Sequence, residues 1–162
     1  MACEHYDSVT VSQIIERADV GRSTFYAHFE TKDELLDQMC GEMFDHVFEG
    51  VNAQCETHSD LNGQGLEGRL AHLLYHLRDT HSGVCGKLLM EGEPHFTRDF
   101  RHRLRALLRD SAPGLARGEV PTDLAYDVLV SAYCQVVTWW FSNGCEADPR
   151  QVAAWYLELV RP

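Results

Sequence analysis

The apolar residues of this 162-residue chain recur at helical spacing almost from end to end. Between residues 31 and 55 they follow one another at intervals of three and four, which places them on one face of a long helix. The same spacing predicts further helices over residues 66–80, 84–90, 95–110, 122–143 and 149–160. No segment alternates apolar and polar residues as a half-buried strand does. We therefore expect an all-α protein.

Start and stop signals sharpen these boundaries. Thr31 with Glu34 matches the capping-box pattern, in which a hydroxyl and a carboxylate satisfy free amides at the start of a helix. Asp148 stands before a proline, a pair that commonly opens a helix. Residues 57–65 and 111–121 are rich in glycine, proline and polar residues, which predicts loops.

Composition narrows the class of protein. The chain is 44% hydrophobic and 24% charged, as globular proteins are. A formal net charge of -11 disfavours binding of nucleic acid or an anionic membrane over the whole surface, although a local docking face remains possible. The six cysteines are scattered and form no C-x-x-C pair, which favours free thiols. Because the chain also begins without an apolar targeting run, we expect it in the cytoplasm.

The N-terminal part combines two short helical segments with a tight turn. Residues 11–18 form the first helix, and Thr10 with Gln13 gives it a capping box. Residues 19–21 supply a turn of the length that a helix-turn-helix needs. Residues 22–29, RSTFYAHF, form the second helix. This arrangement predicts a helix-turn-helix.

The second short helix has an outward and an inward side. Its polar residues suit a DNA duplex, because hydroxyls bind phosphate oxygens and an arginine can bind a guanine edge. These outward residues are Arg22, Ser23, Thr24, Tyr26 and His28. We expect Phe25 and Phe29 to point inward. They would meet the buried face of the first helix, formed by Val11, Ile14, Ile15 and Ala18.

The stretch from Thr10 to Leu36 resembles the TetR family of bacterial transcriptional regulators. The match reads T-V-x-x-I-x-x-x-A-x-V-x-R-S-T-F-Y-x-H-F-x-x-K-x-x-L-L, which is long and specific. The resemblance implies a helix-turn-helix DNA-binding head over residues 1–36 and a helical effector-binding and dimerisation domain over residues 37–162. It further implies a homodimeric repressor that binds palindromic operator DNA and is released by a small-molecule effector.

The same resemblance implies the residues that contact DNA. Thr10 and Ser12 occupy positions that touch the DNA backbone in the family. Arg22, Ser23, Thr24, Tyr26 and His28 lie on its recognition helix. Lys32 matches a phosphate-contacting lysine that opens the next helix.

The chain departs from the family at its start. Only MACEH precedes YDSVTV, where the family has a further helix, so we expect an incomplete head. Residues 1–32 also contain three basic and five acidic side chains, which removes the positive excess that drives phosphate binding. We therefore expect operator binding to be weak or lost. The alternative function is a dimeric ligand-binding or protein-interaction module that no longer binds DNA.

The segment over residues 122–143 is apolar nearly all round, and its polar residues form one narrow stripe. A membrane span is one interpretation, but Asp127 and Gln135 interrupt the run. We prefer a helix buried on two sides, by its own core and by a partner subunit. Together with residues 149–160 it looks like the two dimer-forming helices of the family.

Aromatic and apolar residues of the second domain are candidates for an effector pocket, although most such residues are core. The candidates are Tyr75, Met90, Phe96, Phe100, Tyr133, Trp139 and Trp140.

His72 and His76, with His81 and Cys85 beyond them, include one i, i+4 pair that could chelate a metal. We interpret them as a mixed helix surface and expect neither a metal site nor another cofactor. The chain contains no nucleophile elbow and no glycine-rich phosphate loop. We therefore expect no catalytic residues and no enzyme activity.

Overall fold

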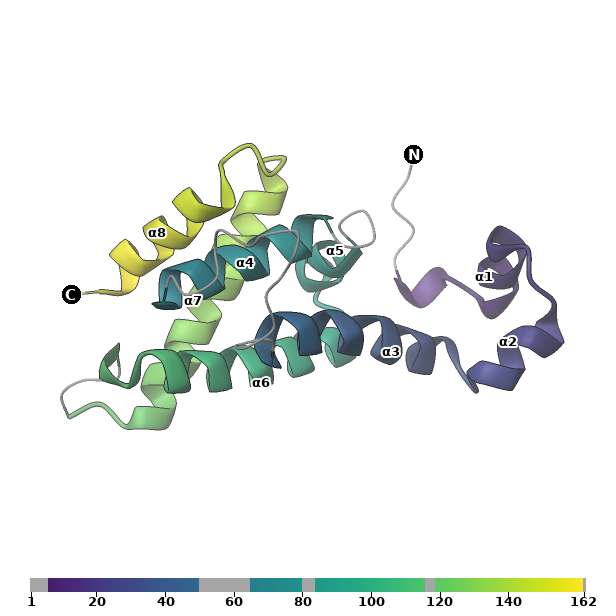
Figure 1. Ribbon diagram of the computed structural model, residues 1–162, viewed down its shortest axis with the longest axis horizontal. Coiled ribbons are helices and arrows are strands. Elements are labelled where there is room, and N and C mark those ends of the chain that lie inside the picture. Colours follow the sequence, from purple (N-terminus) through teal and green to yellow (C-terminus); the bar gives the residue numbers. More distant parts are fainter. Residues whose placement is uncertain (1–5, 50–64, 80–83, 116–118, 162) are drawn as a thin grey trace. The chain divides into compact units, whose positions relative to one another are not determined.

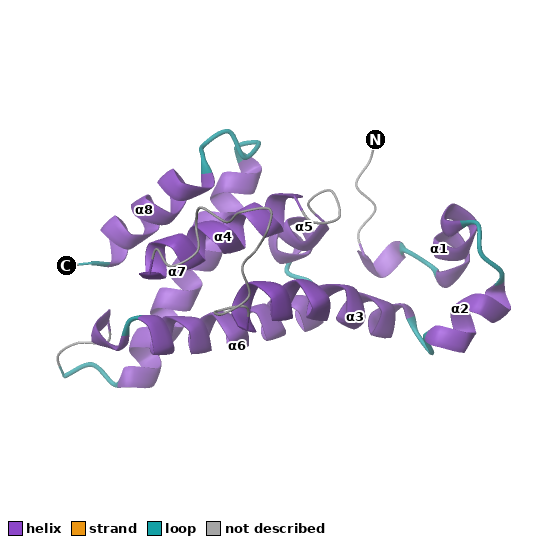
Figure 2. Cartoon of the chain, in the orientation of Figure 1, coloured by secondary structure: helices purple, strands orange, loops and turns teal. Residues whose placement is uncertain are grey.

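The structure, a computed structural model, describes residues 6–49, 65–79, 84–115 and 119–161. Every regular element in these ranges is a helix, which confirms the expected all-α class (Figure 2). The chain divides into two compact units, Met1–Glu42 and Met43–Pro162.

Unit 1 contains the short 3-10 helix η1 (Tyr6–Ser8), α1 (Val11–Ala18), α2 (Arg22–His28) and the start of α3 (Lys32–Phe44), as Figure 1 shows. Its capping box at α1 forms as predicted: Gln13 N donates to Thr10 Oγ1 at 3.3 Å, and Thr10 N donates to Gln13 Oε1 at 2.7 Å. The turn after α1 uses the left-handed region at Asp19, where φ is 53°. Aspartate tolerates this conformation, so the turn reverses the chain without a glycine at that position.

The predicted cap at the start of α3 is confirmed in part. Glu34 N donates to Thr31 Oγ1 at 3.1 Å, as the pattern requires. The Glu34 carboxylate, however, accepts from Glu30 N at 2.6 Å, one residue before the expected amide. Two free amides at the helix start are therefore still satisfied.

The long helix expected over residues 31–55 changes geometry partway. α3 ends at Phe44 and passes directly into a π-helical turn, η2 (Asp45–Glu49). Residues 50–55 lie outside the described part of the chain. π-Helical turns are uncommon and recur at functional sites, so η2 is a candidate functional segment.

Unit 2 adds five helices to η2 and the 3-10 turn η5 (Pro113–Leu115). They are α4 (Gly65–Asp79), α5 (Val84–Glu91), α6 (Pro94–Ser111), α7 (Thr122–Ser142) and α8 (Pro149–Val160), each within a residue or two of its predicted bounds. α4 packs against α8, and α7 packs against α5, α6 and α8 (Figure 1). None of the helices in the described ranges is both long and apolar enough to cross a bilayer.

Two of the buried tyrosines of unit 2, Tyr133 and Tyr156, donate their hydroxyls to backbone carbonyls of neighbouring helices. Tyr133 donates to the carbonyl oxygen of Leu70 at 2.8 Å, and Tyr156 donates to that of Leu129 at 3.1 Å. Their rings meet edge to face at 5.1 Å. Burial raises the pKa of both hydroxyls, because the ionised form would lose its water. These bonds link α7 to α4 and α8 to α7 at the centre of the unit.

The middle of α5 contains a glycine, Gly86, because a neighbouring side chain occupies the space that a Cβ would need. Gly86 is buried, and a Cβ built on it would lie 1.9 Å from Cζ of Phe141 in α7. The ring of Phe141 therefore rests directly on the backbone of α5, and only a residue without a side chain leaves room for it.

We expect Gly86→Ala to destabilise the protein despite the better helix propensity of alanine. Displacing the Phe141 ring costs about 1–3 kcal/mol, against about 1 kcal/mol gained from propensity. Gly41→Ala in α3 is the matched control, because a Cβ there meets nothing within 4 Å. It should stabilise by about 0.5–1 kcal/mol. Urea unfolding followed by helical circular dichroism measures both, and a Gly86→Ala variant as stable as the parent would contradict the packing described.

Candidate nucleic-acid interface

The predicted recognition helix α2 separates its polar and apolar residues as expected. Phe25 is only 5% exposed and packs against the rings of Tyr26 and Phe29, with centroids 5.4 and 5.6 Å away. Every other residue of the helix is exposed, including the five predicted to contact DNA, namely Arg22, Ser23, Thr24, Tyr26 and His28. Phe25 thus fixes the orientation of a short helix whose remaining side chains face solvent.

The first helix of the motif differs from the prediction. Val11, Ile14 and Ile15 are only half-buried, and Ala18 is exposed, so no residue of α1 is fully buried. The reason is that α2 is the one helix with which α1 packs substantially among the described elements. A single short neighbour cannot cover the whole apolar side of an eight-residue helix.

Two predicted DNA-contacting residues are joined in the structure. The Arg22 guanidinium donates to Ser12 Oγ at 3.0 Å, which links the start of α2 to the first turn of α1. A guanidinium has five N–H donors, so this bond leaves others for a base edge or a phosphate. The hydroxyl of Thr10, another predicted DNA contact, bonds Gln13 in the helix cap.

Lys32 is held within unit 1 in a way the sequence did not indicate. Its ammonium group donates to the carbonyl oxygens of Tyr6, Asp7 and Val9 at 2.9, 3.3 and 3.0 Å, and lies 4.5 Å above the Tyr6 ring. The Tyr6 hydroxyl in turn donates to Asp33 Oδ1 at 2.5 Å. All three ammonium donors are thereby directed inward. Lys32 ties η1 to the start of α3, and its predicted phosphate contact stays a prediction.

The charge of this region is unfavourable for non-specific DNA binding. Residues 6–42 contain three basic and eight acidic side chains. One of the three basic groups is Lys32, whose ammonium donates to the three carbonyl oxygens described above. Binding through counterion release needs several cations facing phosphates, so any affinity must come from well-oriented contacts of α2.

The predicted effector residues are not brought together. Phe96 and Phe100 are buried in an aromatic cluster with Phe44, at centroid distances of 5.2 and 6.1 Å from it. Tyr133 and Trp140 are also fully buried, and the indole of Trp140 donates to the carbonyl oxygen of Ala147 at 2.8 Å.

The other three candidates lie nearer the surface. Tyr75 is half-buried and donates to Asp148 at 3.2 Å, and Met90 and Trp139 are 39% and 48% exposed. Four of the seven are therefore core residues.

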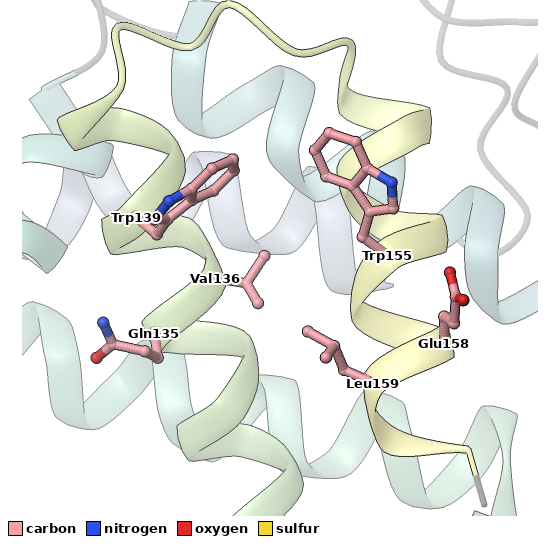
Figure 3. A pocket seen from close by; sticks show the side chains of 6 residues that line it. All are labelled: Gln135, Val136, Trp139, Trp155, Glu158 and Leu159. Atoms are coloured by element: carbon pink, nitrogen blue, oxygen red, sulfur yellow. The ribbon is translucent and has the colours of Figure 1, made fainter.

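An open hollow of about 780 Å³ lies instead between the exposed sides of α7 and α8. Figure 3 shows Trp139 and Trp155 facing each other across it; their rings are 6.1 Å apart. The lining residues are Gln135, Val136, Trp139, Trp155, Glu158 and Leu159. Leu124 and Val128 continue the exposed apolar surface along α7. We call this surface the α7–α8 face.

One group of described side chains could hold a metal. It joins the predicted pair His72 and His76 to His46 of η2. His81 lies outside the described residues, and Cys85 is buried and not part of the group. His46 was missed because its approach depends on the π-helical turn, which the apolar spacing does not reveal.

Comparisons with known proteins agree with this geometry. Residues 1–39 match the family described as bacterial regulatory proteins, tetR family. A crystal structure of a TetR transcriptional regulator from Streptococcus agalactiae 2603V is similar with a TM-score of 0.70 and 28% identity, covering 97% of this chain and 84% of that one.

A stretch of 48 residues is 38% identical to the uncharacterised HTH-type transcriptional regulator YxbF of Bacillus subtilis (strain 168). It spans 27% of this chain but only 13% of that relative. The helix-turn-helix and the helical unit that follows it define a transcriptional regulator. Residues 1–39 thus match the TetR family, and the whole chain is similar in fold to a TetR regulator.

We expect Lys32→Met to loosen unit 1 in the absence of DNA, because three carbonyl oxygens would lose a charged donor. Hydrogen bonds of this kind contribute about 1.5–3 kcal/mol, less where they are exposed. Hydrogen exchange of the amides near Tyr6 and Val9 should accelerate by roughly tenfold or more, the rate equivalent of about 1.4 kcal/mol. Lys87→Met, at the exposed lysine of α5, should leave these amides unchanged. Equal exchange in both variants would show that Lys32 does not hold η1.

Proposed function

We propose that this chain is a dimeric repressor that binds palindromic operator DNA by placing α2 in the major groove. The observation that carries the proposal is the clean division of α2: five polar or aromatic residues face solvent while Phe25 is buried beneath them. A helix held from one side, with hydroxyl, guanidinium and imidazole groups on the other, has the chemistry that reads a duplex.

The exposed residues fall into two groups in this proposal: one binds a base edge and the others bind or flank phosphates. Arg22 binds a guanine edge through donors not used by Ser12, because its fork matches the O6 and N7 acceptors. Tyr26 and the hydroxyls of Ser23 and Thr24 bind phosphate oxygens, which set register without reading sequence. Thr10, Ser12 and His28 flank these contacts, and Lys32 is the remaining phosphate candidate.

The α7–α8 face supports a homodimer. Leu124, Val128 and Leu159 are 53%, 58% and 76% exposed, and Trp139 is 48% exposed. From Leu124 to Trp139 the helix rises about 22 Å, which is longer than one small molecule covers. Soluble proteins rarely leave so long an apolar surface bare. A second copy of the same two helices, related by a two-fold axis, covers it and presents two heads to a palindrome.

Release by a small-molecule effector completes the proposal. It rests on the family alone, because the aromatic residues predicted to line a pocket are dispersed in unit 2. The second candidate function is a dimeric interaction module without DNA binding, and the acidic balance of residues 6–42 favours it.

We expect the chain to sediment as a dimer at micromolar concentration. Val128→Asp and Leu159→Asp each place an uncompensated carboxylate in the seam of both subunits. Each should weaken association by about 2 kcal/mol or more, roughly thirtyfold. Met90→Asp, an exposed apolar position on α5, is the control and should leave the dimer intact. A monomeric parent chain, or equal weakening by all three substitutions, would overturn the dimer proposal.

We expect selection from a random DNA library, at one fixed low salt concentration, to enrich a palindrome. Arg22→Ala should then lose about 1–3 kcal/mol on that site and discriminate less at one base pair of each half-site. Tyr26→Phe should lose about 1 kcal/mol on every sequence alike. Anisotropy titrations with the selected site and its single-base variants distinguish the two patterns. Failure to enrich any sequence would favour the interaction module instead.

A further inference from the structure

Three histidines converge in unit 2 from two separate elements. His46 belongs to η2, and His72 and His76 belong to α4. One ring nitrogen of each lies within 4.8 Å of the other two. The Nε2 atoms of His72 and His76 are 2.9 Å apart, and the ring of His46 is centred 4.7 Å from that of His76 and 5.6 Å from that of His72. Three imidazoles therefore share one small volume.

The backbone on both sides of this cluster is well held. His72 and His76 are four residues apart, so they lie on the same side of α4, and Leu73 and Leu77 beside them are fully buried. Val47 follows His46 into the core at 5% exposure. A metal site needs ligands on elements whose own positions are fixed by packing, and α4 and η2 meet that condition.

The residue before His46 strengthens this hold. Asp45 accepts a hydrogen bond from Arg103 of α6 at 2.9 Å, and Arg103 also pairs with Asp99 at 3.1 Å. The carboxylate of Asp45 is thus turned to α6, and the imidazole of His46 is turned to α4. The π-helical turn of η2 separates the two directions within a single residue step.

We propose that His46, His72 and His76 bind one divalent transition-metal ion of the zinc type. Neutral imidazole is a common ligand for such ions, at metal–nitrogen distances of about 2.0–2.1 Å. Tetrahedral geometry then sets neighbouring nitrogens about 3.3 Å apart, so the His72–His76 pair opens by a few tenths of an ångström and His46 closes in. Rotation of the exposed His46 side chain supplies that movement.

The donor set decides which ion fits. Three nitrogen donors suit zinc and its neighbours in the first transition row, whereas magnesium and calcium require oxygen donors. A net charge of -11 favours a cation over an anion at this surface. Three protein ligands leave a fourth position for water or an added ligand, as in zinc sites that do not serve structure alone.

The test uses the full chain, Zn²⁺ and Co²⁺, without DNA, so its outcome is independent of the proposed repressor function. Titration against a chromophoric chelator should show one ion per chain. His46→Gln and His72→Gln should each lower the metal affinity at least about 100-fold. Loss of a residue that only supports a ligand indirectly can already cost up to about 100-fold, and these residues are direct ligands. His102→Gln, an exposed histidine of α6, should bind as the parent does. No stoichiometric binding, or equal loss in all three variants, would overturn the site.

Two further measurements guard against misreading that result. Circular dichroism and sedimentation of the metal-free variants should match those of the parent. If the metal-free His72→Gln variant loses helix content, the His46→Gln variant alone tests the site. The Co²⁺ complex should show bands of nitrogen and oxygen ligation. A thiolate charge-transfer band would assign the ion to cysteine and refute the histidine site.

The pH dependence of binding distinguishes a metal site from an anion site formed by the same imidazoles. Metal binding requires neutral rings, so affinity should fall as the pH is lowered. Three protonated rings would instead bind phosphate more tightly as the pH falls. Phosphate binding that grows in acid, with no metal binding at pH 7.5, would overturn the proposal.

Discussion

Unit 2 depends on the burial of one side of α4. Leu70, Leu73, Leu74 and Leu77 are completely buried there, and each contributes about 1.5–3 kcal/mol. The carbonyl oxygen of Leu70 receives the hydroxyl of Tyr133, which fixes α7 against the same helix. Because four successive leucine contacts determine the rotation of α4, they also determine which side carries His72 and His76. The geometry of the histidine cluster is thus a consequence of the core.

Unit 1 is held together by different means. Its first helix buries nothing completely, and Phe25 is the buried residue of the second. Polar contacts make up for the small core: Arg22 bonds Ser12, and Lys32 gathers three carbonyl oxygens of the segment before α1. Such contacts orient side chains well but stabilise less than apolar burial does. The head is therefore expected to open more readily than unit 2.

Much of this fold could be predicted from the sequence, because its signals are local. The capping box of Thr10 and Gln13 and the proline after Asp148 mark helix starts that the structure places at the same residues. The polar side of α2 follows from helical spacing around Phe25. Other features depend on contacts between distant residues. Helical spacing does not show that Phe96 and Tyr133 would be core, that Lys32 would reach Tyr6, or that a π-helical turn would bring His46 to α4.

The acidic balance of the head bears on how the proposed repressor would reach specificity. With three basic side chains among residues 6–42, few counterions are released when the head meets a phosphate backbone. Non-specific binding is then weak, and each half-site depends on the oriented contacts of α2. Two weak half-sites bind tightly only when they are linked at a fixed separation, since the second contact becomes intramolecular. The proposed pairing of the α7–α8 face would therefore matter more here than in a strongly basic regulator, because the proposed dimer and not the single head would supply the affinity.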